Sequence, residues 1–110
     1  MHEFVQVVST TARRDEAERI ARGLVEARLA ACVQVSGPVR SVYRWKEAVE
    51  EGDEWIVAAK TRRDLFEPVE KAIRGLHPYE VPEILLLPIL AGSRAYLEWL
   101  DEQLIPASRS

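Results

Sequence analysis

The chain has 110 residues, and 15 Lys and Arg against 18 Asp and Glu give it a formal net charge of −3. Hydrophobic residues make up 47% and charged residues 30% of the sequence, which is typical of one globular domain over residues 1–110. The mild acidity and the lack of a basic run longer than two residues argue against a nucleic-acid partner. The longest apolar run, residues 84–91, is shorter than the roughly 18 residues of a membrane-spanning helix, so no membrane partner is expected.

The first part of the sequence predicts a strand followed by a helix. Residues 4–9 are an apolar, β-branched run that is typical of a buried strand. Residues 15–29 have apolar side chains at helical spacing, and Thr10 and Thr11 are placed to cap that helix. Gly23 lies in the middle of the helix and indicates a close approach to the sheet.

A long hairpin is predicted next. Residues 30–45 have an extended pattern with a break at Gly37 and Pro38, residues 46–51 are expected to turn the chain, and residues 54–61 predict a third strand. A fully extended run of 16 residues covers about 50 Å at about 3.3 Å per residue, whereas a compact domain of this size measures about 35 Å across. The hairpin must therefore bend at the break or project. A projecting hairpin that carries aromatic rings predicts contact with a second copy of the chain.

The remaining sequence predicts a helix, a strand and a final helix. Asp64 and Glu67 have the spacing of a capping box at the start of the second helix. Residues 83–90 predict a fourth strand, in which Pro88 requires an edge or a bulge. Ser93 is placed to cap a short terminal helix. The order β-α-β-β-α-β-α predicts an α+β fold: a ferredoxin-like sandwich of an antiparallel sheet with two helices on one face, an extended hairpin arm and a C-terminal helix.

Few residues of the sequence have the chemistry of a metal or catalytic site. Cys32 is the single cysteine, so it forms no internal disulfide, and its apolar setting favours a small buried side chain over a ligand. Lys60 ends an apolar strand and is expected at a solvated rim, and the acidic run 50–54 is expected to be a solvated loop. His77 lies beside two carboxylates in a loop stiffened by two prolines, which is compatible both with a helix end and with a divalent-metal site.

Several motifs together resemble the CutA divalent-cation-tolerance family, over residues 4–104. The most specific is the run His-Pro-Tyr-Glu-Val-Pro-Glu-Ile at residues 77–84. The others are Leu-Ala-Ala-Cys-Val at 29–33, Ser-Val-Tyr-Arg-Trp at 41–45, Lys-Thr at 60–61 and Tyr-Leu-Glu-Trp-Leu at 96–100. The resemblance implies a homotrimer that is similar in build to the PII signalling proteins, with hairpin arms that join neighbouring subunits. It also implies a cytoplasmic location, in line with an N-terminus that shows no secretory leader.

The resemblance further implies binding of copper (Cu²⁺) or another divalent cation, a role in tolerance to such ions, and no catalytic reaction. The principal metal ligand would then be His77, assisted by Glu80 or Glu83 as hard oxygen donors, and by Cys32 only if its thiol is accessible. The clefts between subunits would be lined by Tyr43, Trp45, Lys60 and Tyr79.

Three positions depart from the pattern of the family. Some relatives have a thiol and a second histidine where this sequence has Ser9 and Leu76, neither of which is a good ligand for a soft or borderline metal. Relatives usually have Gly at the position of Glu47, so the turn at the tip of the arm is expected to differ.

Three functions are compatible with these residues. The first is a homotrimer that binds divalent metal ions near its intersubunit clefts, without an organic cofactor. The alternative is a PII-like regulatory module that holds a small anionic ligand in the same clefts with Lys60 and the aromatic residues, so that metal tolerance is indirect. The scarcity of soft ligands, with one Cys, one Met and two His, favours this alternative. The third is an enzyme with His77 and Glu80 as an acid–base pair, which no nucleophile or cofactor motif supports.

Overall fold

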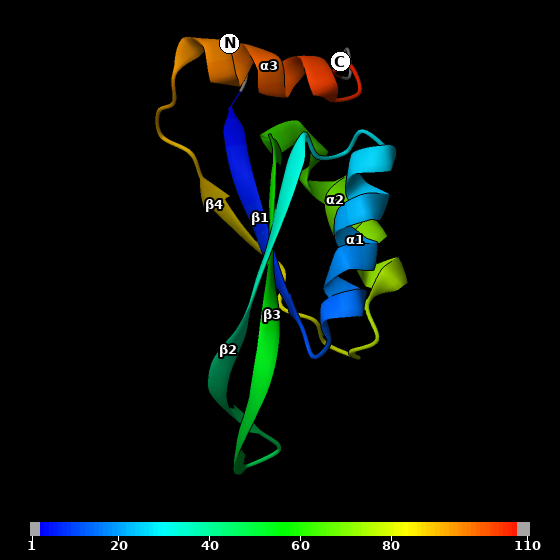
Figure 1. Ribbon diagram of the computed structural model, residues 1–110, viewed down its shortest axis with the longest axis vertical. Coiled ribbons are helices and arrows are strands. Elements are labelled where there is room, and N and C mark those ends of the chain that lie inside the picture. The colour runs from blue at the N-terminus through cyan, green and yellow to red at the C-terminus, as the bar shows by residue number, and fades with distance from the viewer. Residues whose placement is uncertain (1–2, 108–110) are drawn as a thin grey trace.

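The computed structural model describes residues 3–107 and places a four-stranded antiparallel sheet against two helices (Figure 1). The strands are β1 (Phe4–Thr11), β2 (Cys32–Trp45), β3 (Ala48–Arg62) and β4 (Leu85–Pro88), in the spatial order β2-β3-β1-β4. Helices α1 (Arg14–Glu26) and α2 (Phe66–Leu76) cover one face of the sheet, and α3 (Arg94–Gln103) lies across one end (Figure 1). A short 3₁₀ turn, η1 (Arg63–Leu65), precedes α2. This arrangement confirms the predicted α+β, ferredoxin-like fold.

The core lies between the sheet and helices α1 and α2. Buried and half-buried side chains alternate along β1, because successive residues of a strand point to opposite faces of the sheet. The buried ones meet one stripe of each helix, since apolar residues at helical spacing share a face. The apolar side chains of these elements with 0 or 1% exposure include Val5, Val7, Ile20, Leu24, Val57, Val69 and Ile73.

Strands β2 and β3 continue beyond the sheet as a hairpin arm, residues 39–54 (Figure 1). Their register is interrupted between Ser36 and Val39, where a cis peptide bond joins Gly37 to Pro38. The predicted break is therefore confirmed. The arm also projects as expected, and the molecule is 45 Å long but only 26 Å by 24 Å across.

The tip of the arm is a tighter turn than the sequence predicts. Trp45 pairs with Ala48, so Lys46 and Glu47 alone form the turn, with φ angles of 48° and 70°. Two positive φ angles match the twist of a two-residue hairpin, which is why small or Gly residues are favoured there. The prediction of a turn over residues 46–51 is wrong, because the acidic residues belong to β3 and pair with β2. This part of β3 is exposed, so its sequence lacks the apolar alternation by which a strand is predicted.

Two predicted helix caps are wrong and one is confirmed. The threonine pair stays in β1, where the hydroxyl of Thr11 donates to a backbone carbonyl at 2.8 Å, and no side chain caps α1. The carboxylate of Asp64 accepts from the guanidinium of Arg62 at 2.9 Å, and no side chain caps α2. Ser93 caps α3 as predicted, because its hydroxyl accepts from the amide of Tyr96 at 3.3 Å.

A buried arginine holds α3 against the sheet. Arg62, the last residue of β3, is 1% exposed. Its guanidinium donates to the carboxylates of Asp64 and Asp101 at 2.9 Å and to the carbonyl of Ile105 at 2.6 Å. These partners are required because a buried charge is costly unless it is paired and hydrogen-bonded. The expected capping box fails because the carboxylate that it needs is already bound to this guanidinium.

Strand β4 lies at an edge of the sheet and is shorter than predicted. Only Leu85–Pro88 pairs with β1, against the expected residues 83–90, and Pro88 lies at the edge as expected.

Gly23 approaches α2 rather than the sheet, since a Cβ atom there would lie 3.2 Å from Cδ1 of Leu76. Within residues 3–107, no helix combines the length and the apolar character needed to cross a membrane.

Candidate functional site

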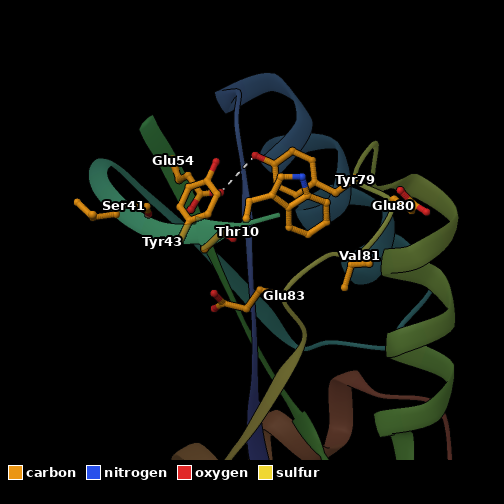
Figure 2. A pocket seen from close by; sticks show the side chains of 10 residues that line it. Thr10, Ser41, Tyr43, Glu54, Tyr79, Glu80, Val81 and Glu83 are labelled. Carbon is orange, nitrogen blue, oxygen red and sulfur yellow. Dashed lines mark hydrogen bonds between the residues drawn. The ribbon is translucent and has the colours of Figure 1, made fainter. Parts of the chain in front are cut away.

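A pocket of about 500 Å³ lies between the arm and the loop that joins α2 to β4 (Figure 2). Its lining residues are Thr10, Ser41, Val42, Tyr43, Trp45, Glu54, Tyr79, Glu80, Val81 and Glu83. Five of the eight residues that the sequence assigned to a site therefore lie around one pocket. Ser41 and Val42 belong to the same 41–45 motif as the two aromatic residues of the arm, so the motif already contained them.

His77 fixes the position of the loop. It is 8% exposed and follows the last residue of α2. Its Nε2 donates to the carbonyl of Thr10 at 2.6 Å, because a carbonyl can only accept, and its Nδ1 accepts from the amide of Tyr79 at 3.1 Å. The ring also packs against that of Tyr79, with 4.7 Å between the ring centroids. Both imidazole nitrogens are thus engaged in holding the loop on β1, and a metal ion would have to displace one of these hydrogen bonds.

Tyr79 joins the loop to the arm. Its hydroxyl donates to Oε2 of Glu54 at 3.2 Å (Figure 2). Burial first, and then the negative charge of Glu54, raise the pKa of the Tyr79 phenol to about 12, so the hydroxyl stays protonated and keeps donating at neutral pH. The sequence reading missed Glu54, because it placed this residue in a solvated acidic loop. The pairing across 25 residues of chain depends on the tertiary structure and has no local signal.

The pocket is acidic and aromatic. Glu54, Glu80 and Glu83 line it, and its lining includes no Lys, Arg or His. Within residues 3–107, neither Glu80 nor Glu83 forms an ion pair. Three carboxylates with no basic side chain among the lining residues favour a negative potential, which attracts cations and repels anions.

Lys60 and Cys32 lie together on another surface. They are register partners on β3 and β2, and Nζ of Lys60 donates to Oε1 of Gln34 at 2.7 Å. The neighbours of Lys60 along β3, Ala59 and Thr61, are buried beneath the helices. Because side chains alternate along a strand, Lys60 is on the open face of the sheet. Neither residue lines the pocket of the arm and the loop.

The metal-binding capacity of these groups is limited to pairs of donors. Within the part of the chain that the structure describes, no three His, Cys, Asp or Glu side chains lie close enough to hold one ion. Ser9 is fully buried and its hydroxyl has no hydrogen-bond partner, while Leu76 ends α2 with 38% exposure. His2 lies outside the described residues. The carboxylates at the pocket are hard oxygen donors, which suit hard divalent cations better than Cu²⁺, a borderline ion for which imidazole nitrogen is a better ligand.

The sequence is similar to proteins of one known family. It matches the family described as "CutA1 divalent ion tolerance protein" over residues 5–103. A divalent-cation tolerance protein CutA of Thermus thermophilus is 44% identical over 96 residues, which make up 87% of this chain and 93% of that protein. A plant relative, the chloroplastic CutA protein of Arabidopsis thaliana, is 38% identical, and the chain spans about half of its length, 53%.

Solved structures agree with this match. The Cut A1 structure from Thermus thermophilus superposes with a TM-score of 0.89 at 42% identity, covering 92% of this chain and 98% of that one. CutA1 from Oryza sativa superposes with a TM-score of 0.93 at 31% identity, covering 96% and 97%. A related structure from Archaeoglobus fulgidus is described as a periplasmic divalent cation tolerance protein. The chain belongs to the CutA1 divalent ion tolerance family.

Proposed function

We propose that this chain forms a homotrimer that binds divalent metal ions at or near the clefts between its subunits, and that this binding underlies a role in divalent-cation tolerance. The observation that carries the proposal is the pair of carboxylates, Glu80 and Glu83, that line one pocket without an ion-pair partner among residues 3–107. The family description supplies the physiological role. No step of a chemical reaction is part of the proposal.

The ligands in this proposal are mainly oxygen atoms. Glu80 or Glu83 would bind the ion directly, and water molecules or groups of a neighbouring subunit would complete its coordination, because hard divalent cations take about six oxygen ligands. His77 serves chiefly to hold the loop that carries Glu80, through its hydrogen bond to Thr10. Cys32 would take part only in a separate site on the open face of the sheet.

The trimer is supported by apolar surface that one subunit leaves exposed. On the arm, Val42 and Val49 are each 62% exposed, and Tyr43 and Trp45 are also exposed. At the opposite edge of the sheet, Leu85 and Leu87 of β4 are exposed as well. Large apolar side chains that one subunit leaves exposed at both edges of its sheet are expected to be covered in an assembly. A cytoplasmic location and a build similar to the PII proteins remain part of the proposal.

No side chain that lines the pocket favours the alternative of a small anionic ligand there. That alternative needs Lys60 beside the aromatic residues, but Lys60 does not line the pocket and donates instead to Gln34, further along the sheet. An anion would also face the charges of Glu54, Glu80 and Glu83.

Calorimetric titration with Mn²⁺ and Cu²⁺ tests the proposal. We expect the double variant Glu80→Gln and Glu83→Gln to bind these ions at least about five-fold more weakly than the wild type, because each substitution removes an anionic ligand but keeps the size of the side chain. Glu67→Gln, an exposed residue of α2, serves as the matched control and should bind as the wild type does. Equal affinities in all three proteins would refute the metal site, and light scattering that shows a monomer at micromolar concentration would refute the trimer.

A further inference from the structure

The pocket between the arm and the loop has a size and a lining that a bare metal ion does not need. Its volume of about 500 Å³ is in the range of pockets that enclose small organic molecules. Aromatic side chains supply part of its wall, in Tyr43, Trp45 and Tyr79. Rings of this kind contribute little to metal coordination, but their faces attract cations.

The carboxylates of the pocket are spread around it rather than gathered at one point. Figure 2 shows Glu54 on the same side as Tyr43 and Tyr79, with Glu80 and Glu83 on other parts of the wall. In the described part of the chain, residues 3–107, no three acidic, His or Cys side chains are close enough to share one ion. This spacing suits a ligand whose positive charge is spread over several atoms.

The aromatic rings and one carboxylate form a local cluster. The hydroxyl of Tyr79 donates to Glu54 at 3.2 Å, which holds this carboxylate beside the rings. Trp45 already takes part in a contact of the relevant kind, because Nζ of Lys46 lies 5.8 Å from the centroid of its ring. An alkylammonium group of the chain itself therefore occupies the same type of position that a ligand would take.

From these observations we infer that the pocket binds a small organic ammonium ion, with its positive nitrogen against the rings of Tyr43 and Tyr79 and its charge balanced by Glu54 and Glu83. The ring faces and the carboxylates attract the same sign of charge, so the two kinds of group reinforce one another. A free cation is favoured over a zwitterionic headgroup, because a phosphate attached to the ligand would meet the negative charge of the pocket. This inference goes beyond the proposed metal binding and does not depend on it.

The first test compares two ligands on the wild-type protein. Choline carries a quaternary ammonium group, and dimethylbutanol is its uncharged carbon isostere, so the pair differs in charge but not in shape. In a buffer with a metal chelator and matched ionic strength, we expect saturable binding of choline that is at least about five-fold tighter than binding of the isostere. Equal binding of the two, or no binding of choline at millimolar concentration, would overturn the inference.

Phosphocholine distinguishes a free cation from a lipid headgroup. We expect it to bind more weakly than choline, since the pocket is lined by carboxylates without a basic side chain. Binding that is equal to or tighter than that of choline would overturn the assignment of a free ammonium ion.

Variants then locate the site. Tyr43→Leu should weaken choline binding about two- to five-fold through loss of a ring, and Glu54→Gln should weaken it about five-fold or more through loss of a charge. The controls are Tyr96→Leu on α3, whose parent residue is exposed to a similar degree as Tyr43, and Glu67→Gln on α2; neither parent residue lines the pocket. Controls that lose as much affinity as the pocket variants would overturn the location. If a variant fails to fold, the wild type alone can be tested by NMR. Transfer of magnetisation from the methyl protons of choline to tyrosine ring protons would place choline beside these rings. The absence of such transfer would contradict the inference.

These results are separable from those on metal ions. Choline binding with no effect of Glu80→Gln and Glu83→Gln on Mn²⁺ or Cu²⁺ would remove the proposed function and leave this inference standing. Conversely, metal binding that depends on those carboxylates, together with equal binding of choline and its isostere, would support the proposed function and refute this inference.

Discussion

Apolar side chains are buried between the sheet and its two helices but exposed to solvent on the hairpin arm. Beneath α1 and α2, Ile20, Leu24 and Ile73 are all 0% exposed. On the arm, Val42 and Val49 each keep 62% of their surface in solvent. The two regions share strands β2 and β3, and the transition falls at Gly37, where the register between them is interrupted. One pair of strands therefore serves the interior of the subunit at one end and presents an exposed surface at the other.

This difference separates the residues that stabilise the subunit from those that are available to a partner or ligand. Burial of apolar surface is the main stabilising contribution to folding, so substitutions under the helices should act on the unfolding free energy. Substitutions on the arm remove surface that the subunit does not bury, so they should act on assembly and binding instead. Four predictions test this separation, in order of decreasing effect on stability.

The largest effect is expected for Ile73→Ala in α2. The substitution leaves a cavity beneath a fully buried position and should lower the unfolding free energy by about 4 kcal/mol, measured by chemical denaturation. Leu76→Ala, in the same helix but 38% exposed, is the matched control and should cost only about 1 kcal/mol. Similar losses for the two variants would contradict a core confined to the face beneath the helices.

Gly37→Ala tests the transition between the two regions. A Cβ atom at residue 37 would lie 2.8 Å from the Trp55 ring, and the φ angle of 153° disfavours any side chain. We expect a loss of about 2 kcal/mol in the unfolding free energy. Gly52→Ala on the arm, where a Cβ atom meets nothing within 4 Å, should change it by no more than about 0.5 kcal/mol. If both variants are equally stable, the path of the chain at the transition is less constrained than the structure indicates.

A smaller effect is expected from the titration of Tyr79, which joins the loop to the arm. Its pKa is raised from 10.0 to about 12 in the folded protein, so the unfolded state releases the proton first as pH rises. The contribution of Tyr79 to stability is fully present below pH 10 and is lost between pH 10 and pH 12. Denaturation at a series of alkaline pH values should show this loss in the wild type, and Tyr79→Phe should reduce it. An unchanged alkaline profile in the variant would assign the loss to other groups.

The smallest effect on folding is expected for Val49→Ser on the arm. It should change the unfolding of the subunit by no more than about 0.5 kcal/mol, yet raise the protein concentration at which the proposed trimer dissociates, measured by light scattering on dilution. Val25→Ser, at an exposed position of α1 with 42% exposure, is the control and should leave assembly unchanged. A trimer that is equally sensitive to both substitutions would break the separation between the two regions.

Local patterns of the sequence predict the region beneath the helices better than the arm. The apolar run of β1 and the helical spacing in α1 and α2 follow directly from burial on one face. The first half of β3 was missed, because exposed strands have no apolar alternation. The capping box at Asp64 was misassigned because its carboxylate pairs with Arg62, and that competition depends on α3, which follows much later in the chain.

The sequence predicts part of the site, and it does so through a motif rather than through apolar patterns. Tyr79, Glu80 and Glu83 were found because a specific motif contains them, and the pocket brings them next to Tyr43. Lys60 was expected in the same cleft, but it lies six residues further along β3 than Glu54, about 20 Å away at about 3.3 Å per residue, and it does not line the pocket. The end of β3 that the loop of residues 79–83 approaches depends on the tertiary structure, which local sequence patterns do not specify.

Pro88 at the edge of the sheet limits how far assembly of this chain can proceed. Continuous addition of strands requires an edge on each side with an unbroken row of backbone donors and acceptors. β4 offers only four residues, and Pro88 has no N–H group to donate. In the proposed trimer, an edge of this kind would oppose growth into fibres and favour a closed ring, even though the opposite edge carries a long hairpin with exposed apolar side chains.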